Sequence, residues 1–158
     1  MQSFVLFVVA LLAVARAEVD YCPSPFVSIG NGCYWVSTSP ATWENARNAC
    51  LSSPIEPETD LAMITDCEEH HHFWNYVAYT LDQKVDYWLG GHDVLEEGRW
   101  KWLNGRDVAM GVPFWYPGEP SGNLGEDFLA FTKEGFFADQ NEDALLHYAC
   151  QVVHFKTD

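Results

Sequence analysis

Positive charge is scarce in this sequence. Its 158 residues include 8 Lys and Arg against 23 Asp and Glu, which gives a formal net charge of −15. Nucleic-acid phosphates and anionic membrane surfaces both attract basic proteins, so we expect neither as a partner. An excess of carboxylates favours solubility, or the binding of a hard cation such as Ca2+, which takes only oxygen ligands. The length fits one ordinary globular domain.

Long hydrophobic runs are also missing. The apolar run at residues 4–15 is shorter than the roughly 20 residues that a bilayer-spanning helix needs. It leads into Ala15-Arg16-Ala17, an A-x-A cleavage pattern, so residues 1–17 are predicted to be a secretory signal peptide. No second run of membrane-spanning length follows. We therefore expect a secreted, extracellular protein without a membrane span, in which residues 18–158 form one domain.

Catalytic signatures are not found. The sequence contains no G-x-S-x-G, P-loop or G-x-G-x-x-G pattern, and no cysteine stands in a catalytic context. The run His70-His71-His72 does not fit a zinc site, because consecutive residues of a helix point about 100° apart. We interpret it as part of a polar helix face. The sequence therefore predicts a protein that is not an enzyme.

Five cysteines become disulfide candidates once secretion is expected. Cys22 and Cys33 flank a short Pro- and Gly-rich stretch suited to a small closed loop, whereas Cys50 and Cys150 lie 100 residues apart. Spacing alone does not fix the pairing, and Cys67 is left over under any scheme with these two bridges. It is either a buried free thiol or the link of a disulfide-bonded dimer.

The order of predicted elements indicates an α+β domain. Residues 31–37 are rich in aromatic and β-branched side chains and predict a strand. Helices are predicted at 39–50, after Ser and Thr caps, and at 66–81, with acidic residues in its first turn. Short strands separated by Gly and Pro follow from residue 87, and Leu103-Asn104-Gly105-Arg106 predicts a two-residue hairpin loop. Helices therefore come first, and a loop-rich antiparallel sheet follows.

Several motifs, taken in order, resemble the C-type lectin family. The resemblance covers about Cys22 to Gln151 and rests on seven segments in order: Cys22-Pro23 followed by Cys33-Tyr34-Trp35, the first-helix signature at 42–50, Leu61 to Ile64, Trp88-Leu89-Gly90-Gly91, the strand and turn at 97–105, Trp115 to Pro120, and Tyr148 to Gln151. It implies a long-form C-type lectin-like fold, with two helices and a small antiparallel sheet carrying long irregular binding loops. It also implies the bridges Cys22–Cys33 and Cys50–Cys150. The family's inner bridge is missing, since Phe128 and Glu142 stand at its two positions.

The resemblance also implies a Ca2+ site that binds sugar hydroxyls. The metal-binding and carbohydrate-binding positions carry over to Glu119, Ser121, Glu126 and Asp139, with Pro120 in cis. Both amides of the family site are lost, because Ser121 and Ala138 stand in their places. Asn123, Gln140 and Asn141 lie near enough in sequence to substitute for them. Among the aromatic residues, Trp115 and Tyr116 are the candidates for stacking on sugar, whereas Trp43, Trp88, Trp100 and Trp102 are expected in the core.

Two functions follow from this comparison. The first is a secreted carbohydrate-binding protein with Ca2+ as cofactor, which leans toward mannose-type glycans through Glu119-Pro120 and acts in innate immune recognition, as family members often do. The second is a lectin-like domain whose sugar site has degenerated and which binds protein or mineral surfaces without Ca2+. Ser121, Ala138 and the missing inner bridge favour the second.

Overall fold

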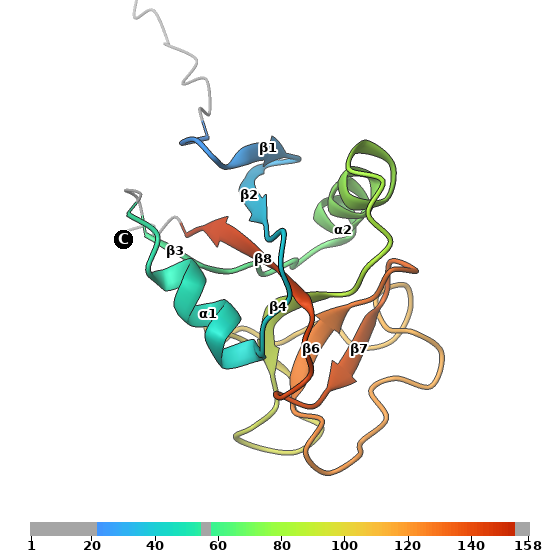
Figure 1. Ribbon diagram of the computed structural model, residues 1–158. Coiled ribbons are helices and arrows are strands. Elements are labelled where there is room, and N and C mark those ends of the chain that lie inside the picture. The colour runs from blue at the N-terminus through green and yellow to red at the C-terminus, as the bar shows by residue number, and fades with distance from the viewer. Residues whose placement is uncertain (1–21, 55–57, 154–158) are drawn as a thin grey trace, which may run out of the picture.

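The computed structural model describes residues 22–54 and 58–153, so the predicted signal peptide lies outside the described residues. In chain order the elements are β1 (Val27–Ile29), β2 (Gly32–Val36), α1 (Trp43–Leu51), β3 (Thr59–Leu61), α2 (Cys67–Asn75), the π-helical turn η1 (Tyr76–Thr80), β4 (Tyr87–His92), β5 (Lys101–Trp102), β6 (Phe128–Phe131), β7 (Phe137–Gln140) and β8 (His147–Val152). The α+β class and the early position of both helices are as predicted (Figure 1).

The strands form two groups joined by β8. One group runs β1-β2-β8 with β3 on the other edge of β8, and the second runs β4-β6-β7 with β5 beside β4. All pairs are antiparallel except β4 with β8, which is parallel, so the predicted antiparallel sheet is in fact mixed. In Figure 1 the β6-β7 hairpin and the long loops before it occupy the end of the molecule away from β1.

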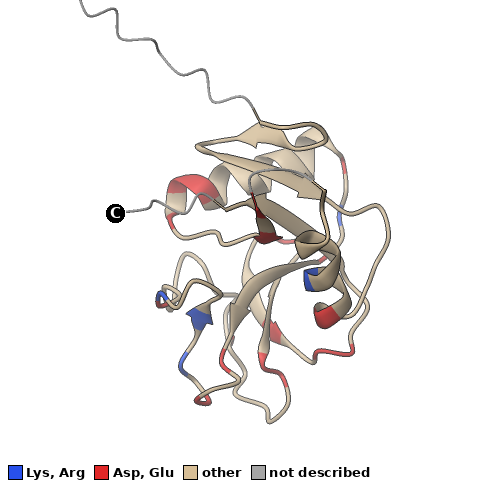
Figure 2. Ribbon diagram, turned by 90° about the vertical axis from the view of Figure 1, so that its left-hand side faces the viewer, with Lys and Arg blue, Asp and Glu red and all other residues tan. Residues whose placement is uncertain are grey.

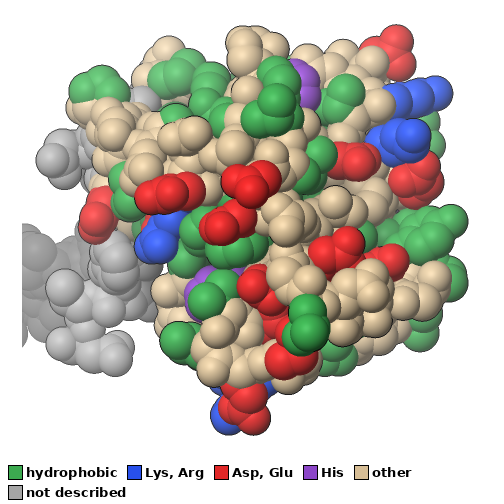
Figure 3. Space-filling model, turned by 60° about the horizontal axis from the view of Figure 1, so that its bottom comes forward, with side chains coloured by type: hydrophobic (Ala, Val, Ile, Leu, Met, Phe, Trp, Pro, Cys, Tyr) green, Lys and Arg blue, Asp and Glu red, His purple; other side chains and the backbone are tan. Residues whose placement is uncertain are grey.

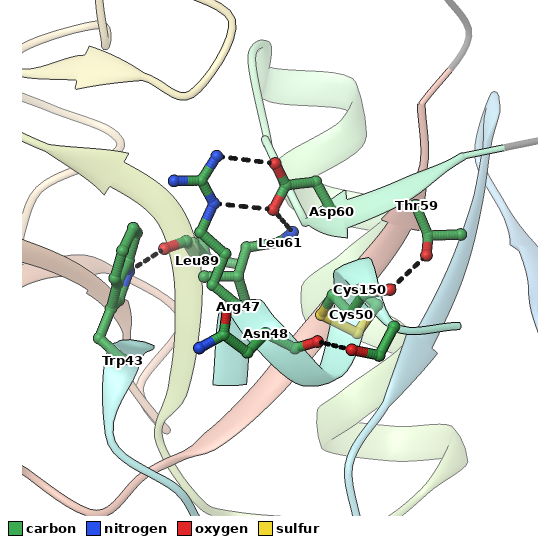
Figure 4. Close-up of polar contacts among 10 residues, drawn as sticks. Trp43, Arg47, Asn48, Cys50, Thr59, Asp60, Leu61, Leu89 and Cys150 are labelled. Atoms are coloured by element: carbon green, nitrogen blue, oxygen red, sulfur yellow. Dashed lines mark hydrogen bonds and ion pairs between the residues drawn. A yellow bond between two sulfur atoms is a disulfide. The ribbon is translucent and has the colours of Figure 1, made fainter. Parts of the chain in front are cut away.

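Helix α1 begins later than predicted, at Trp43. Thr42 has an extended backbone and its side chain accepts the Asn45 N–H at 3.4 Å, which makes it the N-cap. The Trp43 indole N–H donates to the Leu89 carbonyl in β4 at 2.9 Å. One turn on, Arg47 makes two hydrogen bonds of 3.2 Å to Asp60 of β3 (Figure 4). These contacts and the Cys50–Cys150 bridge fix α1 on the sheet.

Helix α2 ends earlier than predicted. Asp66 is its N-cap, accepting the Glu69 N–H at 2.8 Å, as the acidic start of the segment suggested. After Asn75 the chain widens into η1, where the Leu81 N–H donates to the Tyr76 carbonyl five residues back. The widened turn keeps Val77 and Ala78 buried. Over the described residues, no helix is both long enough and apolar enough to cross a membrane.

The prediction that the histidine run lies on a polar helix face is wrong, because the run divides between the core and the surface. His70 is half-buried, and its ring lies 5.1–5.5 Å from the rings of Phe114, Phe131 and Phe137. His71 bonds to Asn75 at 2.8 Å on the exposed side. Burial lowers the pKa of His70, with a further contribution from the neighbouring histidine.

The core is aromatic, and both disulfides contribute to it. Trp43, Trp88, Trp100 and Trp102 are all buried, which confirms their predicted core role. The bridges Cys22–Cys33 and Cys50–Cys150 are also confirmed. Cys67 is free and exposed at the start of α2, so the buried-thiol alternative is wrong.

The predicted two-residue hairpin is a three-residue loop. Lys101 pairs with Asp107, and the Trp102 N–H donates to the Arg106 carbonyl, which leaves residues 103–105 in the loop. Gly105 takes a positive φ of 81°, as this loop type requires at its last residue.

Candidate functional site

A group of carboxylates lies where the long loop before β6 meets the end of β7. Glu119, Ser121 and Glu126 belong to the loop, and Asp139 belongs to β7, where it pairs with Leu129 of β6. The Glu119–Pro120 peptide bond is cis, as the resemblance implied. Acidic positions recur along the loops at this end of the ribbon (Figure 2), and the same face carries many acidic side chains on its surface (Figure 3).

Ser121 connects these carboxylates to one another. Its hydroxyl lies 2.7 Å from Glu126 Oε2 and 3.0 Å from Asp139 Oδ2, and with one proton it donates to one of them at a time. The backbone N–H groups of Ser121 and Gly122 donate to the same Asp139 oxygen at 2.8 and 3.2 Å. The structure therefore brings together Ser121, Glu126 and Asp139, which the sequence places up to 18 residues apart.

Glu119 and Asp139 share a proton-binding site. A hydrogen bond with Asp139, followed by burial, raises the pKa of Glu119 to about 7. Burial alone would raise the pKa of Asp139, but hydrogen bonds from Glu119 and Ser121 lower it on balance. At neutral pH the pair thus holds negative charge on Asp139 and a partly bound proton on Glu119. The hydrogen bond between the two places Glu119 beside the other carboxylates.

Asp139 also has an unsatisfied oxygen. The residue is only 3% exposed, and apart from the proton held with Glu119 its Oδ1 has no hydrogen-bond partner among the described residues. A buried carboxylate oxygen without a partner carries a desolvation cost of about 1–3 kcal/mol or more. Such an atom is one that a bound cation would satisfy.

A second acidic group adjoins the first, and sequence reasoning missed it. Asp93 follows β4, its backbone N–H donates to the Asp127 carbonyl at 3.1 Å, and its buried Oδ1 also has no partner among the described residues. Burial, together with the charges of Asp127 and Asp139, raises the pKa of Asp93. Desolvation and the charges of Asp93, Asp127 and Asp139 raise that of Glu97 as well. The signal available in the sequence was the pair Asp93 and Glu97 directly after Trp88-Leu89-Gly90-Gly91.

The positions of the lost amides are now defined. The Ala138 side chain is 7% exposed and offers no polar atom. Asn123 contacts Glu126, because its Nδ2 donates to Oε2 at 2.9 Å. Asn141 instead contacts the Gly125 backbone, where its Nδ2 donates to the carbonyl oxygen at 3.0 Å. Neither contact was predictable from the sequence spacing.

The two candidate stacking residues differ in outcome. Trp115 is 1% exposed, and its indole N–H donates to the Ala109 carbonyl at 3.0 Å, so its predicted role as a sugar platform is wrong. Its loop folds back onto the core, where its ring lies 5.0 Å from that of Trp100. Tyr116 is 44% exposed, its backbone carbonyl accepts the Glu119 N–H at 2.8 Å, and it stays a candidate.

The donor set fits a hard cation in its chemistry. Glu119, Glu126 and Asp139 with the Ser121 hydroxyl offer oxygen atoms only, as Ca2+ requires, and two buried carboxylate oxygens nearby lack partners. Over residues 22–54 and 58–153, however, no three His, Cys, Asp or Glu side chains are already arranged around a metal position. Holding a cation therefore requires the hydrogen bonds of Ser121 and the Glu119–Asp139 proton to give way.

The shared proton predicts a pH-dependent stability of the metal-free protein. The pKa of Glu119 in the folded protein, about 7, lies above its ordinary value of 4.5, so the folded state binds more protons than the unfolded state. The protein therefore loses stability as the pH rises from 4.5 to about 7. Glu119→Gln removes that loss. In EDTA, its Tm relative to wild type is expected to rise by a few degrees between pH 5 and pH 8, measured by calorimetry.

Other groups whose titration changes stability are the same in wild type and in Glu119→Gln, so the difference in Tm between the two proteins reports on Glu119. His70 and His92 have lowered pKa values and contribute stability of the opposite sign as pH rises, but equally in wild type and variant. Glu134→Gln, at an exposed position away from the site, should show a Tm difference from wild type that does not change with pH. A flat difference for Glu119→Gln would contradict the shared proton.

The fold is that of a C-type lectin-like domain. Residues 39–152 match the family model described as the Lectin C-type domain. The structure of the C-type lectin CEL-I from Cucumaria echinata superimposes with a TM-score of 0.73 and 28% identity, covering 84% of this chain and 97% of that one. The chain belongs to the C-type lectin family.

Individual relatives are similar at a comparable level. The human protein C-type lectin domain family 17, member A is 32% identical over 130 residues, which cover 82% of this chain and 32% of the relative. Perlucin-like protein from Mytilus galloprovincialis is 28% identical over 78% of this chain and 76% of its own length. Against the first of these and two further relatives, the chain spans 32–45% of their length. These homologues are C-type lectins, a non-enzymatic family, in agreement with the missing catalytic motifs.

Proposed function

We propose that this chain binds glycans and that the binding depends on Ca2+ held by the loop carboxylates. The observation that carries the proposal is Asp139, a buried carboxylate with one unpartnered oxygen at the meeting point of Glu119, Ser121 and Glu126. Family membership supports it, and the structural neighbour CEL-I is a C-type lectin.

Each residue has a distinct part in this proposal. Glu119, Glu126 and Asp139 supply carboxylate oxygens, and Ser121 supplies a hydroxyl oxygen, for metal and sugar together. Ca2+, when bound, provides a positive centre to which two sugar hydroxyls attach as ligands. The backbone N–H groups of Ser121 and Gly122 keep Asp139 in place through Oδ2, which leaves Oδ1 free to act as a ligand.

The finer parts of the proposal rest on the sequence. Glu119-Pro120 favours mannose-type glycans, and the exposed Tyr116 offers a surface on which a sugar ring can stack. Secretion is supported by the A-x-A pattern at residues 15–17 and by two disulfides, which form and persist in oxidising compartments. A secreted glycan-binding domain suits a role in innate immune recognition. The exposed Cys67 suits a disulfide-linked dimer, which non-reducing gels of wild type and Cys67→Ser would distinguish from a monomer.

A glycan array tests the function directly. Protein stripped with EDTA and reloaded with Ca2+ is expected to bind a subset of glycans, with mannose-type structures among them, and to lose the signal when EDTA is added back. Mg2+ should restore little, because it demands a tighter octahedral site than these flexible loop ligands provide. Signals that persist in EDTA would contradict the metal-dependent mechanism.

A Ca2+-independent function has one observation in its favour. Ser121 already donates to Glu126 Oε2 or Asp139 Oδ2, and a proton held between Glu119 and Asp139 reduces their charge, without any cation. A domain with a degenerate site would bind protein or mineral surfaces through its acidic loop face instead. On the array it would bind no glycan, with or without Ca2+.

A further inference from the structure

The site lacks a neutral oxygen at both positions where the family carries an amide. Ala138 has no polar side-chain atom, and the Ser121 hydroxyl is committed to Glu126 and Asp139. A cation held by carboxylates and this hydroxyl alone has few ligands, since Ca2+ takes 6–8 oxygens. Another oxygen from the same loop would improve the site.

Asn123 is the amide that the structure places on the carboxylates. Its Nδ2 donates to Glu126 Oε2 at 2.9 Å, and its backbone N–H donates to Ser121 Oγ at 3.2 Å. A turn, in which the Glu126 N–H donates to the Asn123 carbonyl at 3.1 Å, holds the two side chains on the same side of the loop. Asn123 thus contacts two of the four proposed ligands, although it lies two residues beyond the expected amide position.

The cluster that Asn123 joins has an independent sign of a missing ligand. Asp139 is 97% buried, and its Oδ1 is unpartnered within the described chain, next to the oxygen that accepts the Ser121 hydrogen bonds. Apart from the proton held with Glu119, hydrogen bonds among the loop residues do not satisfy this atom. It therefore points to a cation rather than to a merely solvated acidic loop.

Asn141, a neighbouring amide, is not available for the same task. Asn141 uses both ends of its side chain on the backbone, because Nδ2 donates to the Gly125 carbonyl and Oδ1 accepts the Asp143 N–H, each at 3.0 Å. Asn123, by contrast, uses only its Nδ2, and its Oδ1 accepts no hydrogen bond from any described residue. Only the second arrangement leaves a neutral oxygen beside the carboxylates.

We propose that Asn123 replaces the lost amide, supplying its Oδ1 as a neutral ligand to the cation while its Nδ2 orients Glu126. This inference rests on the proposed Ca2+-dependent function and deepens it. The amide has moved along the loop from position 121 to position 123, and Ser121 has become the residue that connects the carboxylates.

Calorimetric titration of Ca2+ alone into EDTA-stripped protein tests the assignment. Asn123→Ala is expected to raise the Kd for Ca2+ about tenfold or more, in the range found when groups supporting a metal site are removed. Asn123→Asp keeps a side-chain oxygen at the same place, so its Kd should stay within about threefold of wild type or fall. Asn141→Ala is the matched control, since it removes a loop hydrogen bond without touching a carboxylate, and should change the Kd less than about threefold.

The outcomes separate this inference from the function on which it rests. Equal weakening by Asn123→Ala and Asn141→Ala would show a loop-packing effect and overturn it, while Ca2+ binding by wild type would stand. Weakening by Asn123→Asp as severe as that by Asn123→Ala would overturn the ligand role of Oδ1, because both variants lose the Nδ2 contact with Glu126 and the oxygen kept by aspartate would then contribute nothing. No saturable Ca2+ binding by wild type would overturn the proposed function and this inference with it.

Discussion

Replacing both Cys50 and Cys150 with alanine is expected to lower the free energy of unfolding by about 4.7 kcal/mol, the chain-entropy value for a 100-residue loop. Natural domains are stable by about 5–15 kcal/mol, so this loss leaves the protein close to unfolding at 37 °C. The bridge joins α1 to β8, and Cys150 pairs with both Trp35 of β2 and Leu61 of β3. Its loss therefore removes the covalent link between the helix and the central strand.

The second disulfide provides the matched control. Cys22–Cys33 closes 11 residues, for which the same relation gives about 2.8 kcal/mol. Denaturant unfolding of the two double-alanine variants, both in a Cys67→Ser background to prevent thiol exchange, measures the difference. A loss for Cys22/Cys33 equal to or larger than that for Cys50/Cys150 would contradict the account of the long loop.

Asp139→Asn is expected to weaken Ca2+ binding by at least about 100-fold and to abolish Ca2+-dependent glycan binding. Changes in groups that only support a metal ligand typically cost 10–100-fold, and Asp139 is proposed as a ligand itself. The substitution is nearly isosteric and keeps an oxygen for the Ser121 and Gly122 N–H groups. It removes the negative charge and so leaves the site one carboxylate short. The Ser121 hydroxyl and the two backbone N–H groups all donate to the same oxygen of residue 139.

An isosteric change outside the site controls for net charge. Asp143→Asn removes one negative charge from an exposed position four residues after Asp139. The backbone N–H of Asp143 donates to the Asn141 side chain, and among the described residues its carboxylate makes no hydrogen bond. Its Ca2+ affinity should change less than about threefold, because exposed charges a few residues away are screened by salt. Similar losses in the two variants would mean that bulk acidity, rather than the Asp139 site, attracts Ca2+.

The sequence predicts well those features that depend on local chemistry. Acidic residues in the first turn predict a helix that begins near Asp66, and the Ser and Thr caps predict a helix near Trp43. The wide turn after Asn75 leaves no such signal, because Val77 and Ala78 fit an ordinary helical face equally well. Its spacing is set by packing against the sheet rather than by the residues themselves.

Long-range packing explains the errors in the core. Trp115 stands in a Gly- and Pro-rich segment that reads as an exposed loop, yet the segment carries its own core side chains and folds back onto Phe137. His70 is polar in sequence but fills a space between three phenylalanine rings. Both outcomes depend on contacts between residues more than 20 positions apart, which periodicity does not report.

The candidate site was predictable in its members but not in its connections. Glu119, Glu126 and Asp139 follow from the family pattern, since that pattern specifies positions. The hydroxyl of Ser121 between two carboxylates, and the contact of Asn123 with Glu126, follow from loop geometry created by the substitutions at 121 and 138. A family pattern cannot describe the positions at which a chain departs from it.

One titration tests the central claim most directly. A glycan selected from the array is titrated into the protein in a calorimeter, once with saturating Ca2+ and once with EDTA at the same pH and ionic strength. The account predicts a saturable isotherm with Ca2+ and no detectable heat of binding with EDTA. An isotherm of the same affinity in both solutions would contradict it.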